Sequence, residues 1–517
     1  MPIVEQTSLK RSGRFMINGF TMTAVALLMR SVAMAFNSYV TRTAGAEAVG
    51  LYSLLSSVYG FAITLALSGI SLSVTRLVAE YLAINDTLSA EKVMKRSFAY
   101  ALFFGFLSTV LLLSLAETAA STWLHELRVV RPLRLLSITL PCAAVSSVIN
   151  GYFTAVRRVY KNAIAQSTEM FIKIAVTVSL FYLIGDRDAE VTCVLLALGG
   201  IVSEGIVLIF NLTVYVIDTK KYLKSPTGAL PQPYIGRKIF EISTPVALTS
   251  YVRSALISIE HSLIPKGLIR YGADKASALA SYGTLGSMAL TVINFPYALI
   301  GSFASLMIPE VTESRAQGKK RHIRYLAYRT YQATSVFAFL LMGIFFEFSY
   351  EIGSFLYSSQ LAGDYIRYLS FIVPIMYTDT VTDSLLKGMG EQLYSMKVNI
   401  ADALISVTLV WLLVPRYGVM GYIVTIYIAE IINAALSILR AIKVCNVKFD
   451  ALAVYLKSAL STVGALSLSR IAVNLINVSG IVKFLIYLIV YFMFIKLTYV
   501  FSSDDIKWLK KIFSRAA

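Results

Sequence analysis

LRLLSITLP, residues 133–141, returns later in the chain as IRYLSFIVP, residues 366–374. An Arg, a Leu, a Ser and a Pro fall at the same places in both copies, and most of the other residues are apolar. Further matches follow in the same order: Tyr52 with Tyr282, Tyr160 with Tyr394, and SEGI at 203–206 with AEII at 429–432. Several matches in one order indicate a duplicated chain.

The composition predicts an all-α polytopic membrane protein. Of the 517 residues, 57% are hydrophobic and 15% charged, whereas soluble domains contain about 25% charged residues. The charges gather in short clusters between apolar runs of about 20 residues, the length at which a helix crosses a bilayer. We predict fourteen transmembrane helices, at 15–38, 49–73, 97–118, 133–156, 162–184, 191–217, 239–262, 279–306, 330–350, 365–387, 398–414, 419–439, 452–474 and 481–501.

The positive charges predict which way the helices cross. Most of the 47 Lys and Arg residues lie in the N-terminus, the even-numbered loops and the C-terminal tail. Because positive loops stay on the cytoplasmic side, both termini should be cytoplasmic in a bacterial cell membrane. The net charge of +18 is therefore explained by topology. Binding to nucleic acid is not favoured, because the basic residues are divided among many short loops.

The repeat predicts how the chain is divided. Residues 1–217 would form a six-helix lobe and residues 239–440 a second one, joined by a cytoplasmic linker at 218–238 that is rich in Pro, Gly and Lys. Residues 441–517 would add helices thirteen and fourteen and a basic cytoplasmic tail. Because six is even, the lobes would be related by a pseudo-two-fold axis along the membrane normal. Doubled bundles of this kind are typical of transporters.

Two arginines are the first candidates for a binding role. Arg30 lies within the first predicted span and Arg253 within the seventh, its equivalent in the repeat. A charge inside a bilayer is costly, at least ~2.5 kcal/mol, so it usually faces a cavity or a partner. The planar guanidinium suits phosphate, and we predict that both side chains bind a pyrophosphate. The alternative is that each reaches a lipid headgroup or makes a structural pair.

Three further charged residues lie inside predicted spans, and each of them has two possible roles. Lys173 could join the substrate site, or it could pair with Glu169, which lies one helical turn earlier. Glu204 and Glu430 stand at matched places of the repeat, which favours a shared packing role, although a protonatable coupling carboxylate is the alternative.

A polar group in spans ten to twelve could bind a coupling cation. Asn399, Asp402 and Thr425, together with Asp379 and Asp383, offer oxygen ligands, but polar contacts between helices explain them as well. We predict no cofactor and no metal centre, with Na⁺ or H⁺ as possible coupling ions. Pro141, Pro374, Pro245 and Pro296 mark helix breaks that are either fixed kinks or hinges.

The sequence shows no motif for catalysis. We find no P-loop, no serine nucleophile elbow and no zinc-type His pair, and the predicted outer loops are short. The three cysteines, Cys142, Cys193 and Cys445, are too scattered for a disulfide framework. We therefore predict that the protein is not an enzyme.

The first two spans carry a recognisable pattern. Arg30, Arg42, Gly45 and VGLY at 49–52 are followed by LVAE at 77–80 and by NGYF at 150–153. The chain thereby resembles the stage V sporulation protein B-like branch of the polysaccharide transporters, in the multidrug/oligosaccharidyl-lipid/polysaccharide flippase superfamily.

The resemblance implies a MATE/MOP-like fold with two lobes around a cavity, and movement of a lipid-linked sugar such as lipid II between leaflets. It implies an arginine at the substrate, here Arg30, and a sodium site near Asn399, Asp402 and Thr425. Related flippases carry further cavity arginines in spans two and eight, which this chain lacks there, and Arg253 could compensate.

The expected function is therefore that of a monomeric flippase that contacts membrane lipids and exports a lipid-linked oligosaccharide by alternating access. Two alternatives stay open: a cation-coupled drug antiporter on the same scaffold, and a membrane scaffold that transports nothing.

Overall fold

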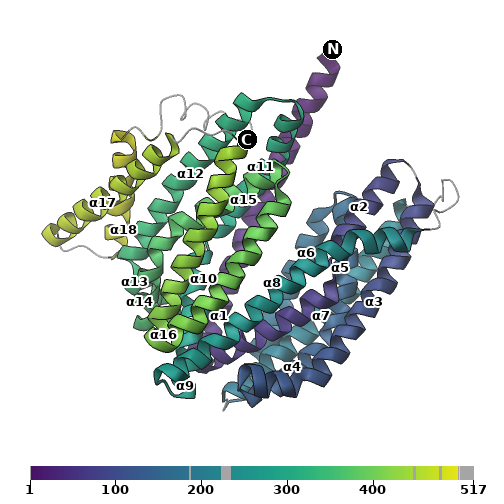
Figure 1. Cartoon of the computed structure of the whole chain (residues 1–517), viewed down its shortest axis with the longest axis horizontal. Helices are drawn as coiled ribbons and strands as arrows, with labels where there is room; N and C mark the ends of the chain where they lie inside the picture. Colours follow the sequence, from purple (N-terminus) through teal and green to yellow (C-terminus); the bar gives the residue numbers. More distant parts are fainter. Residues whose placement is uncertain are drawn as a thin grey trace. The chain divides into compact units, whose positions relative to one another are not determined.

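A computed structural model describes residues 2–84, 86–185, 188–222, 234–445, 450–476, 480–498 and 500. Within these ranges the regular structure is entirely helical (Figure 1). The α-helices are α1 (Pro2–Leu67), α2 (Ile70–Ala83), α3 (Thr87–Thr118), α4 (Val130–Ser137), α5 (Thr139–Ala155), α6 (Val159–Leu183), α7 (Ala189–Tyr222), α8 (Ile235–Tyr271), α9 (Lys275–Gly283), α10 (Leu290–Asn294), α11 (Tyr297–Ala316), α12 (Lys320–Glu347), α13 (Ser349–Tyr357), α14 (Gln360–Leu369), α15 (Val373–Gly388), α16 (Gln392–Cys445), α17 (Asp450–Ile476) and α18 (Gly480–Leu497).

Short segments of other helix types lie between them. Two are π-helical, Ala119–Leu124 after α3 and Thr284–Ala289 before α10, and two are 3₁₀ turns, Leu127–Val129 and Ser370–Ile372.

Two glycines divide the longest helices into separate spans. Gly45 in α1 has φ 85° and Gly418 in α16 has φ 61°, a left-handed backbone that side-chain-bearing residues rarely adopt. Each of these helices therefore covers two of the predicted spans. Among the described residues, eight helices are long and apolar enough to cross a membrane, or nine if the bent pair at Leu127–Ser137 and Thr139–Ala155 is one span. Fourteen crossings are compatible with this result and remain a prediction.

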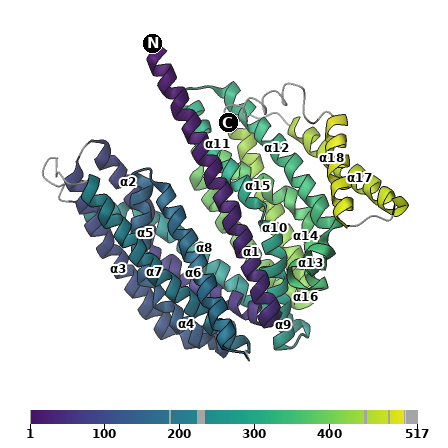
Figure 2. The same ribbon diagram turned by 180° about the vertical axis from the view of Figure 1, so that it is seen from behind.

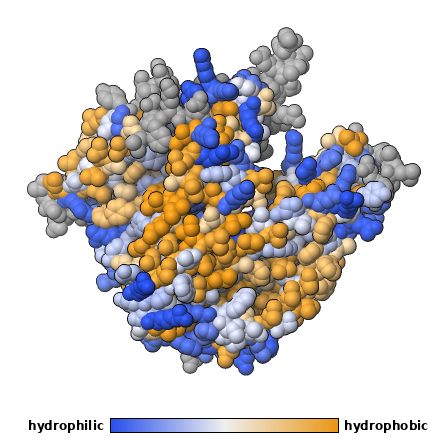
Figure 3. Space-filling view, viewed as in Figure 1, coloured by the Kyte–Doolittle hydropathy of each residue, from blue (hydrophilic) through white to orange (hydrophobic). Residues whose placement is uncertain are grey.

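The surface of the helices fits a lipid environment. Large apolar side chains of α3, such as Phe103, Phe106 and Val110, are more than half exposed. Figure 3 shows hydrophobic side chains covering much of the visible face, while hydrophilic ones gather near helix ends. In water such a surface would be unfavourable, whereas in a bilayer it is the expected one.

The repeated stretch interrupts the α-helix at matched places in both copies. α4 ends at Ser137 and α5 begins at Thr139 with a bend of 46°, and the second copy passes from α14 through a 3₁₀ turn into α15. The serine hydroxyl donates to the carbonyl of the arginine three residues earlier in both, at 2.6 Å for Ser137 and 2.7 Å for Ser370. The prolines that follow lack an N–H, so the helix breaks at the preceding turn.

Contacts divide the chain into two compact units. Unit 1 comprises Met1–Ser38, Met288–Asp402 and Ile423–Ala517, and unit 2 comprises Tyr39–Ser287 and Ala403–Tyr422. The first predicted span thus clusters with unit 1 and the seventh with unit 2. Most of the predicted linker at 218–238 lies outside the described residues, and the predicted lobes 1–217 and 239–440 remain a prediction.

Within unit 1, α15 packs against α11 and α12, and α12 also packs against α17. Figure 2 shows α17 and α18 side by side next to α12. Within unit 2, α5 packs against α2, α3 and α7, and α8 packs against α2 and α3.

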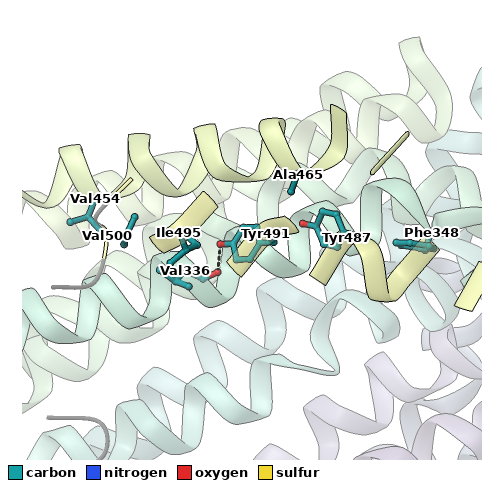
Figure 4. Close-up of a cluster of buried hydrophobic side chains, with 8 residues drawn as sticks. All are labelled: Val336, Phe348, Val454, Ala465, Tyr487, Tyr491, Ile495 and Val500. Carbon is teal, nitrogen blue, oxygen red and sulfur yellow. Dashed lines mark hydrogen bonds between the residues drawn. The ribbon is translucent and has the colours of Figure 1, made fainter. Parts of the chain in front are cut away.

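A tyrosine-rich cluster fixes α17 and α18 to α12. Figure 4 shows the buried rings of Tyr487 and Tyr491 of α18 facing α12. Tyr491 donates to the Val336 carbonyl at 2.7 Å, and Tyr487 to the Leu340 carbonyl at 3.1 Å. Their hydroxyls are therefore satisfied in an otherwise apolar interface.

Candidate functional site

In unit 1 a broken helix exposes backbone carbonyls. α10 ends at Asn294 and α11 begins after Pro296, whose ring and missing N–H prevent a continuous helix. Two carbonyls at the break accept side-chain donors instead. Tyr377 donates to the Ile293 carbonyl at 3.1 Å, and Arg30 donates from Nη1 to the Asn294 carbonyl at 2.8 Å.

Arg30 is anchored there with most of its binding capacity left over. A guanidinium has five N–H donors, and a single hydrogen bond to the Asn294 carbonyl is present within the described part of the chain. The side chain is exposed, and none of the described acidic residues forms an ion pair with it. Its charge lies near the hydroxyl of Tyr377, whose ring stands 6.0 Å from that of Tyr297. An exposed, oriented guanidinium of this kind can bind an anion.

An apolar cavity of about 230 Å³ adjoins this arginine within unit 1. It is lined entirely by apolar residues: Met34, Val292, Phe295, Phe345, Ile352, Phe355 and Leu356. Met34 lies one helical turn after Arg30, and Phe295 follows the Asn294 that Arg30 contacts. A cationic head site beside an apolar pocket fits an amphiphile that carries both a phosphate and a hydrocarbon chain.

Arg253 occupies the exposed face of α8 in unit 2. The opposite face meets the second half of α1 through a stripe of hydroxyls, with Ser258 donating to the Ser57 carbonyl at 2.7 Å and Tyr251 bonded to Ser68. Arg253 lies off this stripe, is exposed, and has no ion-pair partner among the described residues. It is therefore accessible to a ligand, and its predicted place in a substrate cavity stays a prediction.

The predicted pair of Lys173 with Glu169 does not form within 4 Å. Lys173 instead directs its ammonium to Tyr52, with Nζ 3.4 Å from the hydroxyl. The charge of Glu169, one turn earlier on the same helix, still acts on Lys173, so an electrostatic pairing of the two stays a prediction. Whether Lys173 binds substrate stays a prediction, and its partly buried position makes it less open than Arg30 or Arg253.

The matched residues Glu204 and Glu430 have different surroundings. In unit 2, Ser146 donates to Glu204 at 3.5 Å. In unit 1, Glu430 lies near Asp379 and Asp402, close enough for the carboxylates to repel. Ser146 and Asp379 occupy the same place after the proline of the repeated stretch. The repeat therefore preserves the geometry but replaces a hydroxyl with a carboxylate in unit 1.

The acidic group in unit 1 is only partly neutralised by its neighbours. Asn433 donates to Asp379 at 3.0 Å, while the other carboxylate oxygen of Asp379 is buried without a hydrogen bond. Asp383 makes its own ion pair with Lys387 at 2.6 Å. Aligning the repeats residue by residue would have identified Asp379 as the member that departs from symmetry.

The other predicted ion ligands are Asp402, Asn399 and Thr425, and their contacts differ. Asp402 belongs to the acidic group through its charge, as described above. Asn399 turns its amide nitrogen to the Ser395 carbonyl of its own helix at 2.8 Å, and Thr425 is fully buried. Among the described residues, no three His, Cys, Asp or Glu side chains are arranged to hold a metal ion.

The sequence reasoning missed Tyr377 and the apolar cavity. Tyr377 is a single aromatic residue in an apolar span and carries no signal of its own. The cavity forms from α1, α10, α12 and α13 and the break after α10, and such a surface cannot be read from one helix at a time.

Comparisons with known proteins agree with this architecture. Residues 15–307 match the family described as "Polysaccharide biosynthesis protein". Stage V sporulation protein B of Bacillus subtilis (strain 168) is 23% identical over 416 residues, covering 79% of both chains. Sporulation protein YkvU of the same organism is 20% identical over 410 residues, covering 77% of this chain and 88% of that protein.

Two solved structures show the fold. The lipid II flippase MurJ in an inward closed conformation matches with a TM-score of 0.71 and 12% identity, over 93% of this chain and 99% of that one. A MATE family multidrug transporter of the MOP superfamily in its inward-facing conformation matches with a TM-score of 0.65 and 15% identity, over 81% and 94%. The predicted MATE/MOP-like membrane fold is confirmed.

Proposed function

Because this chain belongs to the polysaccharide biosynthesis protein family, we propose that it is a membrane flippase for a lipid-linked oligosaccharide. It would carry the sugar from the inner to the outer leaflet of the bacterial cell membrane, with both termini in the cytoplasm. The relatives named for sporulation and for lipid II favour a cell-wall or spore-cortex precursor as the substrate class.

The observation that carries this proposal is the position of Arg30. It presents free guanidinium donors at a helix break, directly beside an apolar cavity. A lipid-linked sugar has the matching chemistry, since its pyrophosphate needs a cation and its first hydrocarbon units need an apolar wall. Unit 2 has an exposed cation of its own, Arg253, and a more enclosed one, Lys173, and both remain predicted substrate ligands.

Transport requires no covalent step in this scheme. A monomer would alternate between inward and outward access, and the pyrophosphate would be held by charge and hydrogen bonds until release. The kinks at Pro141, Pro374 and Pro296 are places where helices can bend without breaking a complete hydrogen-bond ladder.

We further propose that the acidic group in unit 1 couples transport to a cation. The charges of Asp379 and Glu430 repel each other at partly buried positions, which favours a shared proton or a bound Na⁺. Asp402 would contribute to this site, with Asn399 and Thr425 as additional oxygen ligands. Glu204, bonded to Ser146, would serve as the structural counterpart in unit 2.

A drug or small-molecule antiporter is the second candidate, and the MATE-like fold together with the acidic group favours it. It predicts that cationic drugs stimulate proton or sodium flux in vesicles. A flippase predicts no such response to drugs.

Complementation tests the proposed function directly. The gene would be expressed in bacteria depleted of their own lipid II flippase, and we expect growth and cell shape to recover. The Arg30→Ala/Arg253→Ala variant, expressed to the same level in the membrane, should not rescue. Failure of the unaltered protein to rescue, combined with drug-stimulated ion flux, would favour the antiporter.

A further inference from the structure

A second pocket lies within unit 2, away from the residues assigned above. It has a volume of about 130 Å³ and is formed where α8 approaches its C-terminal end. Its walls include His125, Lys266, Arg270, Trp411 and Pro415. The pocket thus combines three basic side chains with one large aromatic ring.

Lys266 and Arg270 form a like-charge pair on one helix face. They stand one turn apart in α8, a spacing at which like charges destabilise a helix. Neither forms an ion pair with any described acidic residue. Lys266 uses a single donor, from Nζ to the Thr122 carbonyl at 3.2 Å, and Arg270 is exposed. The repulsion from Arg270 adds to the burial that lowers the pKa of Lys266.

The acid that follows the pocket residue His125 in the sequence, Glu126, already binds other cations. Glu126 accepts two hydrogen bonds from Arg128, at 2.8 and 3.0 Å, and its charge also interacts with Lys275. The uncompensated charge of Lys266 and Arg270 is therefore left for a ligand. An anion placed between them would relieve their repulsion.

The position of the pocket along the helices indicates the kind of anion. The predicted span of α8 ends at residue 262, so Lys266 lies one turn beyond it and Arg270 two turns beyond it. Trp411 lies near the end of the predicted span 398–414 and is more than half exposed. Tryptophan at the membrane interface, with basic residues just outside, is the arrangement found at lipid headgroups.

Close packing gives the pocket a rigid floor. At Gly267 an added Cβ would lie 2.7 Å from Val414, so only glycine lets α8 approach α16 this closely. His125, in a left-handed conformation with Nδ1 2.6 Å from the Ser121 carbonyl, closes the side formed by the π-helical turn. The basic groups are thus carried on fixed backbone rather than on free loops.

We propose that this pocket binds the phosphate of an anionic lipid headgroup in the leaflet at the Tyr271 end of α8. The phosphate would lie between Lys266 and Arg270, with the Trp411 ring at the level of the ester groups and Pro415 against the upper chain. Two sources supply this chemistry: a bulk phospholipid, or the pyrophosphate of a lipid-linked sugar that has reached this leaflet. The pocket would bind either one whether or not the protein transports lipid.

Fluorescence quenching of Trp411 tests the proposal. The chain has three tryptophans, so Trp123→Phe and Trp508→Phe leave Trp411 as the single reporter. The protein is reconstituted in vesicles that contain a small fixed fraction of either brominated phosphatidylglycerol or brominated phosphatidylcholine. We expect a preference of roughly tenfold for the anionic lipid, which Lys266→Ala/Arg270→Ala abolishes.

Two further variants control the result. Lys92→Ala/Arg96→Ala removes two cations at the same spacing from α3 and should keep the preference. Lys266→Arg/Arg270→Lys retains both charges and should also keep it, which guards against misfolding of the alanine variant. Equal quenching by the two lipids in the unaltered pocket would overturn the proposal, as would an equal loss in the Lys92/Arg96 variant.

Competition identifies the source. Displacement of brominated phosphatidylglycerol by an equimolar amount of unlabelled polyprenyl diphosphate assigns the pocket to the lipid-linked substrate. Retention of the phosphatidylglycerol assigns it to bulk phospholipid.

Discussion

At the residue scale, Arg30 is held by one hydrogen bond and offers the others to a ligand. We expect Arg30→Ala to weaken phosphate binding by roughly 1.5–3 kcal/mol, which is about 10- to 150-fold. Arg30→Lys should recover part of this loss, because it keeps the charge but not the planar fork. Binding of a lipid-linked pyrophosphate to purified protein would be measured by titration.

Arg76 provides the matched control for this experiment. It is exposed on α2 in unit 2 and lies at the end of a predicted span. Arg76→Ala should leave the affinity unchanged. Equal affinities of the Arg30→Ala and Arg76→Ala variants would remove Arg30 from the substrate site.

Glu126 gives the protein a predictable response to acid. Burial of this carboxyl raises its pKa, but the hydrogen bonds and charge of Arg128 lower it more, so the pKa of Glu126 lies below its usual value. A carboxyl whose pKa is lowered by folding stabilises the folded state. This stabilisation is complete when the pH is above the ordinary Glu pKa of about 4.3, and it is lost as the pH falls through the pKa of the folded state.

We therefore expect Glu126→Gln to lower the melting temperature at pH 7 and to lose this effect in acid. The difference in melting temperature between the two proteins should shrink once the pH is below about 4. Glu91→Gln, at an exposed pair with Lys95, should show little difference at any pH. If the difference in melting temperature between the unaltered protein and Glu126→Gln did not change with pH, the lowered pKa of Glu126 would be contradicted.

At the element scale, removing the helix break at Pro296 should affect stability and transport in different ways. Restoring a continuous helix with Pro296→Ala would give the carbonyls of Ile293 and Asn294 internal partners, and Arg30 and Tyr377 would lose theirs. Because an interior proline costs a helix about 3 kcal/mol, we expect an unchanged or higher melting temperature. Transport should fall at least about tenfold, since the Arg30 guanidinium loses its anchor.

Pro309 is a suitable control, because it also lies inside α11 in unit 1. Pro309→Ala should stabilise the helix without reducing transport. If both variants transported equally well, the broken helix would have no part in substrate binding.

Glu347 is a second element-scale test, because it joins three helices. Its carboxylate, 5% exposed, binds Arg470 of α17 at 2.6 Å and Lys483 of α18 at 2.8 Å. Both cations are partly solvated, so we expect Glu347→Gln to cost about 1–3 kcal/mol, less than a fully buried pair would. Hydrogen exchange should rise in α17 and α18 but not in α15. Glu241→Gln removes an exposed ion pair with Arg237 and should change neither the stability nor the hydrogen exchange of α17 and α18.

The sequence predicted some elements well because their signals are local. Ser137 with Pro141 and Ser370 with Pro374 mark the kinks directly, since proline removes a donor wherever it stands. Arg253 was selected as a candidate because a charge in an apolar run is rare, and its binding role stays a prediction. The partner of Lys173 could not be predicted, because Tyr52 comes from a distant helix. The π-helical turns likewise carry no distinctive residue pattern.

At the scale of the whole molecule, the two copies of the repeat are similar but differ at one matched polar position. Both copies keep the kink and the glutamates at 204 and 430, whereas Ser146 and Asp379 differ at one matched place. If this difference creates the coupling site, Asp379→Ser should abolish ion dependence of transport and leave the fold intact. The reverse change, Ser146→Asp, should not restore coupling by itself.

Leaflet transfer in reconstituted vesicles tests the central claim most directly. Fluorescent lipid II would be placed in one leaflet, and its arrival in the other would be followed with an impermeant quencher. We predict that the unaltered protein transfers it and that Arg30→Ala/Arg253→Ala does not, although both are folded and inserted. Full transfer by the double variant would contradict the assignment of the arginines, and no transfer by the unaltered protein would contradict the function.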